Sequence, residues 1–164
     1  EKLTDGEPTM FIRDYLTIKN GVISNIEELY FDFKSFDVEN KMNRKDLLAD
    51  MLKYAEYYRQ ITKGETGDKR IDRKLKQISN IGTTVHLPFL LSFFDYANEK
   101  ELRQEEVYKV LDIVENYWAR RIICGYPANA MQKLFSMLHS DIMRIYKRHE
   151  ERNVPVTVKS LPEK

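Results

Sequence analysis

The stretch NRKDLLADMLKYAEYYRQITKG, residues 43–64, decides the fold class. Its apolar residues recur every three or four positions, which is the spacing that places side chains on one face of an α-helix. Asn43 can cap the amino end of such a helix, and Gly64 can end it in the left-handed conformation. The predicted inward face consists of Leu47, Leu48, Met51, Leu52, Ala55, Tyr58 and Ile61. This stretch therefore predicts a long amphipathic helix.

The same spacing recurs along most of the chain, and no run alternates long enough to predict a sheet. Further helices are predicted within residues 9–21, 24–36, 68–82, 88–97, 104–125 and 128–152. Residues 153–164 contain two prolines and are predicted to form an extended tail or linker. We therefore predict an all-α fold in which residues 1–152 form a single domain, a bundle of about six to seven helices, with a short extended C-terminal tail.

Two of these helices make specific packing predictions. The helix within 24–36 can begin with a capping box, because Ser24 stands three residues before Glu27. Its predicted buried face consists of Ile26, Leu29, Tyr30, Phe33 and Phe36. The segment 88–97, which Pro88 can open, is apolar nearly all round and is therefore expected at the centre of the bundle.

The composition limits the functional classes. The chain of 164 residues carries 27 Lys and Arg against 26 Asp and Glu, so only a local patch could attract nucleic acid or anionic lipid. A single cysteine excludes an internal disulfide, and no Cys or His stands at metal-ligand spacing, so we predict no metal and no cofactor. The longest apolar run is too short to cross a membrane. We expect a cytoplasmic protein fragment, since the sequence begins with Glu1 and shows no signal peptide.

Basic residues gather in the helix predicted within 68–82. Cations repeat along one side of this helix, an arrangement that can follow a phosphate backbone. The candidate DNA-contact residues are Lys69, Arg70, Arg73, Lys74 and Lys76. A run of charge is also typical of an ordinary solvated helix face, so both interpretations stay open.

The stretch RRIICGYPANAMQKLF, residues 120–135, is predicted to be a corner between two helices. Gly125 and Pro127 can end the first helix, while Asn129 and Gln132 have capping-box spacing for the second. Cys124 follows two isoleucines on the apolar side of the first helix and is predicted to be a buried structural thiol. This explanation leaves no reactive centre at the corner.

Arg121 falls inside the apolar arc of the helix that precedes this corner. Its guanidinium could extend to solvent or bond the last carbonyls of its own helix. Alternatively, it could pair with a buried carboxylate from another helix, for which Asp14 and Asp95 are candidates.

Catalytic signatures are sparse, and no residue is predicted to be catalytic. The one match is the pair Arg144 and His149, which has the R-x4-H spacing of the helical HEPN ribonucleases. In that family a small polar residue usually follows the arginine, whereas Ile145 follows it here.

Three segments together resemble a known family: FIRDYLTIKNG at residues 11–21, IEELYFDFKSF at 26–36 and ENYWARRIICGYPANAMQKLF at 115–135. They are similar to the helical middle region of GmrSD-type modification-dependent restriction proteins, bacterial anti-phage enzymes long catalogued as a domain of unknown function. The likeness covers roughly residues 9–150. The positions that match the family pattern are Arg13, Asp14, Arg120, Arg121, Gly125 and Asn129.

The resemblance implies a non-catalytic module within a longer restriction protein. In that family an N-terminal ParB-like domain carries a D-G-Q-Q-R nucleotide-hydrolysis motif, and an HNH-type nuclease domain often follows the helical region. Neither motif occurs in this sequence, so the partners implied are those missing domains and, through the basic helix, the DNA backbone. The matching positions are expected to have architectural roles. Two alternatives stay open, a helical protein-interaction or regulatory bundle and a HEPN-like ribonuclease.

Overall fold

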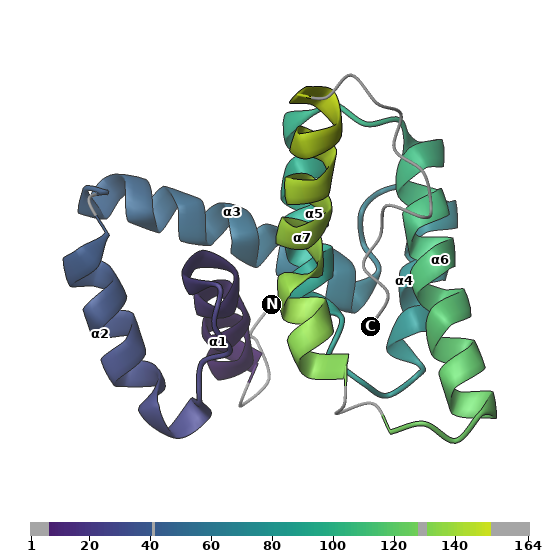
Figure 1. Cartoon of the computed structure of the whole chain (residues 1–164), viewed down its shortest axis with the longest axis horizontal. Coiled ribbons are helices and arrows are strands. Elements are labelled where there is room, and N and C mark those ends of the chain that lie inside the picture. Colours follow the sequence, from purple (N-terminus) through teal and green to yellow (C-terminus); the bar gives the residue numbers. More distant parts are fainter. Residues whose placement is uncertain (1–6, 41, 128–130, 152–164) are drawn as a thin grey trace.

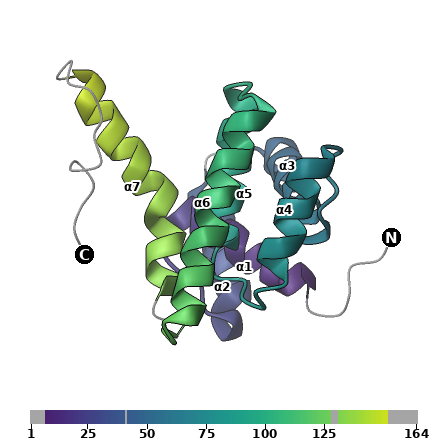
Figure 2. The ribbon, with the colours of Figure 1, turned by 90° about the vertical axis from the view of Figure 1, so that its right-hand side faces the viewer.

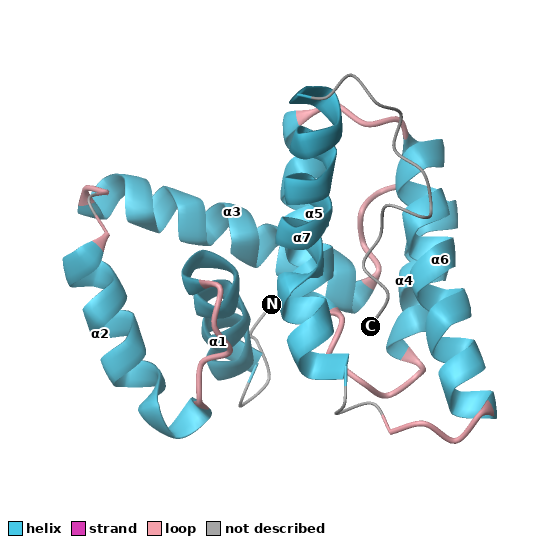
Figure 3. Cartoon of the chain, viewed as in Figure 1, coloured by secondary structure: helices cyan, strands magenta, loops and turns pink. Residues whose placement is uncertain are grey.

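The structure is a computed structural model that describes residues 7–40, 42–127 and 131–151. Over these residues the chain forms helices and loops and no strand (Figure 3). The elements are α1 (Glu7–Asn20), a 3-10 helix (Ile26–Glu28), α2 (Leu29–Glu39), α3 (Arg44–Lys63), α4 (Lys69–Ser79), α5 (Leu87–Glu99), α6 (Gln104–Ile123) and α7 (Gln132–Glu151). The predicted all-α bundle is confirmed, and the predicted tail lies outside the described residues.

Helix α5 is the centre of the fold, as its apolar sequence predicted. It packs against α1, α3 and α7, with α1 to α3 on one side of it and α4 and α6 on the other (Figure 1). Pro88 lies in its first turn, where a missing amide proton removes no helical hydrogen bond. Its buried side chains are Leu87, Pro88, Phe89, Leu90, Leu91, Phe93 and Phe94.

Helices α6 and α7 meet near the corner that joins them and diverge toward the C-terminal end of α7 (Figure 2). Where they meet, the Trp118 ring stacks on Phe135 with centroids 5.4 Å apart, and Tyr117 packs edge-on against the same phenyl ring. Both Trp118 and Phe135 are buried. This aromatic contact joins α6 to the rest of the core at its C-terminal end.

The ends of α3 are built as predicted. The Asn43 side chain accepts hydrogen bonds from the amides of Lys45 and Asp46, both at 3.0 Å. At the other end Gly64 is left-handed, with φ of 62°. A Cβ at this position would also lie 2.8 Å from the carbonyl oxygen of Asp72 in α4. Glycine is therefore required both for the turn and for the close approach of α4.

The predicted inward face of α3 is only partly correct. Leu47, Tyr58 and Ile61 are buried, but Leu48 and Leu52 point to solvent. Tyr54 and Tyr57 are buried in their place, where their rings pack on Tyr15 of α1 and Phe94 of α5 respectively. The buried face is rotated toward these rings because they fill more of the space between helices than leucine does.

The start of α2 also differs from the prediction. Ser24 does not cap a helix; it is buried, and its amide donates to the Thr17 hydroxyl oxygen of α1 at 3.4 Å. The cap is Asn25, whose side-chain oxygen accepts from the Glu27 amide at 3.3 Å and opens the 3-10 helix. Of the five residues predicted to be buried, Leu29 is buried, Phe33 and Phe36 are half-buried, and Ile26 and Tyr30 are exposed.

Candidate nucleic-acid interface

Helix α4 forms for local reasons that the sequence shows. Asp68 caps it, because its carboxylate accepts from the amides of Arg70 and Ile71 at 2.7 and 3.0 Å. A narrow apolar stripe then faces α3 and α6, and its members Ile71, Leu75 and Ile78 are buried as predicted. All other positions on this short helix are free to carry charge.

Lys74, one of the five candidate DNA-contact residues, is not on the exposed face of α4. Its side chain is buried in the α4–α6 seam, where the ammonium donates to Asp112 at 2.9 Å and to Glu115 at 2.5 Å. Burial alone would lower the pKa of Lys74, but the hydrogen bonds to Glu115 and Asp112 hold it above its usual value. Lys74 thereby joins α4 to α6 through ion pairs with Asp112 and Glu115.

Arg70 also turns toward α6, although it remains exposed. Its guanidinium donates to Glu105 at 2.9 Å and lies over the Tyr108 ring, 4.1 Å from the centroid. The Lys74 ammonium lies 5.1 Å from the same ring. Two of the five predicted cations are therefore already neutralised by carboxylates of α6.

The other three cations, Lys69, Arg73 and Lys76, form the remaining basic surface. They stand at positions i, i+4 and i+7, so they share one face of α4, and all three are exposed. Within the described residues none of them makes an ion pair with a carboxylate. We call these three residues the α4 cation row.

The acids nearest in sequence to this row are already hydrogen-bonded. Asp68 caps α4, as described, and Asp72 accepts from the Thr66 amide at 2.6 Å and from the Thr66 hydroxyl at 2.7 Å. The Asp68 carboxylate is therefore directed at the first turn of α4, and the Asp72 carboxylate at the loop before it. The α4 cation row is thus three cations on a solvated helix face, without a carboxylate bound to any of them among the described residues.

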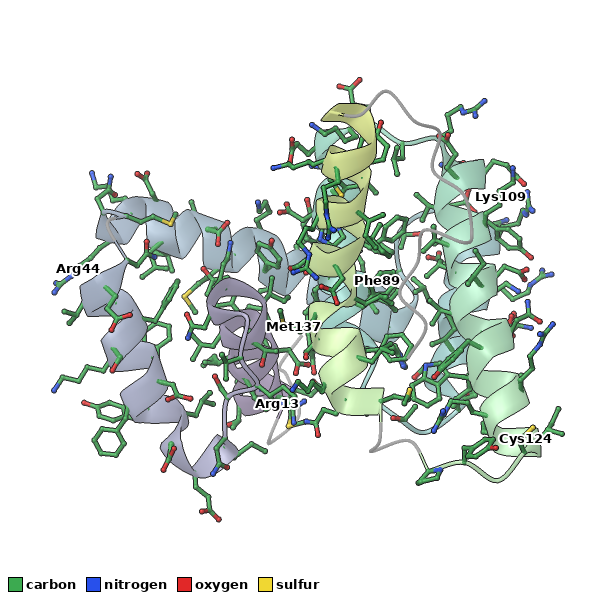
Figure 4. All side chains as sticks on the ribbon, viewed as in Figure 1. Arg13, Arg44, Phe89, Lys109, Cys124 and Met137 are labelled. Atoms are coloured by element: carbon green, nitrogen blue, oxygen red, sulfur yellow. The ribbon has the colours of Figure 1, made fainter. Side chains whose placement is uncertain are left out.

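Arg13 and Asp14 form an ion pair within α1. Nε and Nη2 of Arg13 both donate to Oδ1 of Asp14, at 3.1 and 2.8 Å. Asp14 is fully buried, and burial raises its pKa to about 6 against the opposing effect of Arg13. Its Oδ2 has no partner among the described residues. The pair lines a cavity of about 220 Å³ to which Gln132 of α7 also contributes, and Figure 4 shows Arg13 lying beside the first turns of α7.

At the corner after α6, Arg121 has neither of the predicted carboxylate partners. Its Nη2 donates to the Pro127 carbonyl at 2.9 Å, and its guanidinium lies 5.8 and 5.3 Å from the Tyr117 and Tyr126 ring centroids. Asp14 is paired with Arg13, and Asp95 with residues of α3. Arg121 thus binds a carbonyl of the loop beyond its own helix and joins the end of α6 to that loop.

The other corner residues have simple positions. Gly125 is left-handed, with φ of 68°, as expected for the residue after a helix. Arg120 is exposed, and Asn129 lies outside the described residues. Cys124 is exposed at the end of α6 (Figure 4), so the prediction of a buried thiol is wrong. The helix has reached the edge of the fold there, and its apolar side no longer faces a neighbour.

A polar network between α1, α3 and α5 was not predicted. The Tyr15 hydroxyl and the Lys19 ammonium both contact Oδ2 of Asp50, each at 2.7 Å. Lys53 links Oδ1 of Asp50, at 3.5 Å, to Oδ1 of Asp95, at 2.8 Å. Burial would raise the pKa of Asp50, but its bonds to Lys19 and Tyr15 lower it.

The network ends at Tyr54, whose hydroxyl donates to Oδ2 of Asp95 at 2.8 Å. Lys19 also lies 4.5 Å from the centroid of this ring. Tyr54 and Asp95 line a cavity of about 490 Å³ between α5 and α7, together with His139. The residues that α1, α3 and α5 contribute are more than 30 positions apart in sequence from one helix to the next, so no local pattern could have brought them together.

The described residues contain no group of three or more His, Cys, Asp or Glu side chains that could hold a metal ion. Arg144 pairs with Asp141 at 2.7 Å, and the side chain of His149 lies outside the described part of the chain. The hypothesis of a ribonuclease site formed by Arg144 and His149 therefore stays untested.

Comparisons with known proteins give no further information, since no family model, curated protein or solved structure matches the chain. Among the described residues, no helix is both long and apolar enough to pass through a lipid bilayer.

Proposed function

We propose that this chain is a non-catalytic helical module of a cytoplasmic, modification-dependent DNA restriction protein. In this proposal it connects a nucleotide-hydrolysing domain to a nuclease domain and touches the DNA backbone through the α4 cation row. The observation that carries the DNA contact is the row itself, three exposed cations on one helix face without ion-pair partners among the described residues.

The positions of the family-pattern residues support the non-catalytic part of the proposal. Arg13 and Asp14 are paired with each other, Arg121 bonds a loop carbonyl and Gly125 ends a helix. The last two contacts shape the corner after α6, and the Arg13–Asp14 pair lies within α1. The isolated chain is accordingly expected neither to hydrolyse nucleotides nor to cut DNA or RNA, and metal-dependent cleavage by the pure chain would contradict the proposal.

Binding through this row is expected to be weak. Three phosphate contacts on a molecule of net charge +1 correspond to a dissociation constant on the order of 10⁻⁵ M at physiological salt. Binding should depend little on base sequence, because cations aimed at phosphates position a protein without reading bases.

A salt titration of binding to a short duplex tests the DNA contact. In the variant Lys69→Ala/Arg73→Ala/Lys76→Ala, the slope of log K against log salt should flatten by about 2.7, which is about 0.9 for each lost contact. The matched control is Arg44→Ala/Lys45→Ala/Lys109→Ala, which removes three exposed cations elsewhere, with Arg44 and Lys109 on opposite sides of the molecule (Figure 4). Equal slopes in the two variants would show that DNA binding depends only on total charge. The chain would then be a purely structural connector without a DNA contact through the α4 cation row.

A further inference from the structure

Helix α2 is apolar on two opposite faces. Toward the core it buries Leu29 and half-buries Phe33 and Phe36. On the other side Tyr30, Phe31 and Val38 are 71%, 66% and 78% exposed. At 100° per residue, Phe31 and Val38 lie within roughly 20° of each other and point directly away from the buried side. We call Tyr30, Phe31 and Val38 the outer α2 face.

This arrangement is unusual for a helix at the edge of a fold. A soluble helix that is apolar on both sides is normally covered on both sides. Here α2 packs mainly on α1, and it lies at the far left of the molecule in Figure 1, with no other helix outside it. Of the fifteen large apolar side chains exposed in the described residues, six lie between Val22 and Met42. The segment around α2 therefore carries six of these side chains, and the other nine are distributed over α3, α6, α7 and the corner after α6.

The charges around the outer α2 face have one predominant sign. Five carboxylates lie between residues 27 and 39, namely Glu27, Glu28, Asp32, Asp37 and Glu39, and a single lysine, Lys34, accompanies them. The ion pairs of the described residues include none of these six side chains. An apolar strip with uncompensated carboxylates on its flanks is complementary to an apolar strip with basic flanks.

The length of the strip defines the shape of the partner. From Tyr30 to Val38 the face runs along about two helical turns, or about 12 Å. Phe31 and Val38 are seven residues apart, a spacing that presents anchors on one helix face to a second helix, whose own apolar residues recur at three- and four-residue intervals. Tyr30 lies at the edge of this strip, 100° round the helix from Phe31. The backbone amides of α2 are already bonded within the helix, so an added strand would find no hydrogen-bonding edge.

We propose that the outer α2 face is a docking site for an amphipathic helix with a basic polar face, supplied by another protein or domain. The aromatic pair Tyr30 and Phe31, whose rings meet edge-on at 5.5 Å, forms the anchor. The surrounding carboxylates select a basic partner and reject an acidic one. This site is separate from the α4 cation row, so each of the two proposals can fail without the other.

Peptide binding tests the site. The probe is a fluorescent synthetic helix of leucine and lysine, about four turns long, and its companion has glutamate in place of every lysine. The wild-type chain should bind the lysine peptide at least about ten-fold more tightly than the glutamate peptide, because the latter meets like charges. Phe31→Ser/Val38→Ser should weaken binding of the lysine peptide by about ten-fold or more, since buried aromatic anchors dominate such contacts.

Two controls distinguish the face from general stickiness or general charge. Ile113→Ser removes an equally exposed isoleucine on α6 and should change the affinity by less than about two-fold. Asp37→Asn/Glu39→Gln keeps the apolar anchors and should weaken binding at low salt while having little effect at high salt. Because all substituted side chains are exposed, thermal melts of the variants should match that of the wild type.

Two results would overturn the proposal. Equal affinity of the lysine peptide for wild type, Phe31→Ser/Val38→Ser and Ile113→Ser would show that the outer α2 face is not the site. Sedimentation that shows a dimer of the wild-type chain, abolished by Phe31→Ser/Val38→Ser, would identify a second copy as the occupant in place of a basic partner.

Discussion

Helices α2 and α4 lie at opposite edges of the fold, and each has one face on the core (Figure 1). On α4 the buried side is a narrow apolar stripe of three residues together with Lys74, and the outward side carries Lys69, Arg73 and Lys76. On α2 the buried side contains Leu29, yet the outward side carries Phe31 and Val38 among carboxylates. The two edges therefore differ in charge and in polarity. The outer side of α4 is charged and is well solvated by water, whereas the outer side of α2 exposes apolar side chains to water.

This difference explains under which condition an apolar pattern identifies the buried side of a helix: only one side of the helix must be apolar. On α4 only one side is apolar, so the stripe had a single possible orientation and was predicted correctly. On α2 aromatic residues occupy both sides, so several orientations bury about as much apolar surface, and Tyr30 was assigned to the wrong one. The ambiguity that misled the prediction is the same feature that indicates a partner for α2.

The strongest test of this comparison removes one large apolar side chain from each edge. Leu75→Ala on α4 should lower the free energy of unfolding by about 3 to 4 kcal/mol, because Leu75 is buried among the core residues and its loss leaves a cavity. Phe31→Ala on α2 should change it by less than about 0.5 kcal/mol, since its ring is exposed. Denaturant melts of the two variants measure both values. Equal losses would mean that the outer face of α2 is packed against the chain itself.

A second test concerns His86, at the start of the central helix between the two edges. The side chain is buried, its Nδ1 has no partner among the described residues, and burial lowers its pKa from 6.5 to about 4. Between these two pH values the unfolded chain binds a proton that the folded chain does not. The stability that neutral His86 provides above pH 6.5 is therefore lost as the pH falls, by roughly 3 kcal/mol at pH 4.

The variant His86→Leu isolates this effect. Asp14 acts in the opposite direction, because burial raises its folded pKa to about 6 and its protonation favours the folded state as the pH falls. Taking the difference between wild type and His86→Leu at each pH cancels Asp14 and every other group. A difference that stays constant from pH 7 to pH 4 would show that the His86 ring is accessible to water.

A third test compares two lysines on α4 that sequence analysis placed in the same group. Lys74→Met should cost about 2 kcal/mol of stability, because it leaves Asp112 and Glu115 facing each other without the ammonium between them. The cost stays below that of a fully buried pair, since both carboxylates remain partly solvated. Lys69→Met on the exposed side should change stability by less than about 0.5 kcal/mol. If both variants melt alike, Lys74 belongs to the solvated face after all.

These cases show how far sequence reasoning reaches in this protein. The capping box predicted at Ser24 was wrong, because Asn25 is the cap, but the other signals at helix ends were correct. Asn43 caps α3, Gly64 and Gly125 are left-handed, and Pro88 lies in the first turn of α5. Each depends on a few neighbouring residues, so the pattern contains all the necessary information.

Contacts between distant segments were not predictable in the same way. The burial of Lys74 depends on carboxylates of α6 that are 38 and 41 positions away, and a charge run alone is compatible with either a solvated or a buried lysine. The network from Tyr15 to Asp95 similarly requires three helices to meet at one place. Sequence patterns specify which face of a helix is apolar, but the neighbour of that face follows from the packing of the whole chain.

The smallest expected effect concerns Arg121, which sequence analysis placed on the apolar arc of α6. A buried carboxylate partner would have made its removal cost several kcal/mol, and a fully solvated side chain would have made removal almost neutral. The structure gives an intermediate case: Arg121 donates to the Pro127 carbonyl at 2.9 Å and to the Tyr117 hydroxyl at 3.4 Å, and two tyrosine rings lie within 6 Å of its guanidinium. Arg121→Met should therefore cost about 1 kcal/mol, because it removes one short and one long hydrogen bond to neutral acceptors and two partly solvated cation–π contacts while keeping the apolar stem. The neighbouring Arg120→Met, at an exposed position, is the matched control and should be neutral to within about 0.5 kcal/mol. Denaturant melts at two salt concentrations complete the test: the loss in Arg121→Met should persist at high salt, since its main partner is a carbonyl, whereas a loss that disappears with salt would reveal a carboxylate partner.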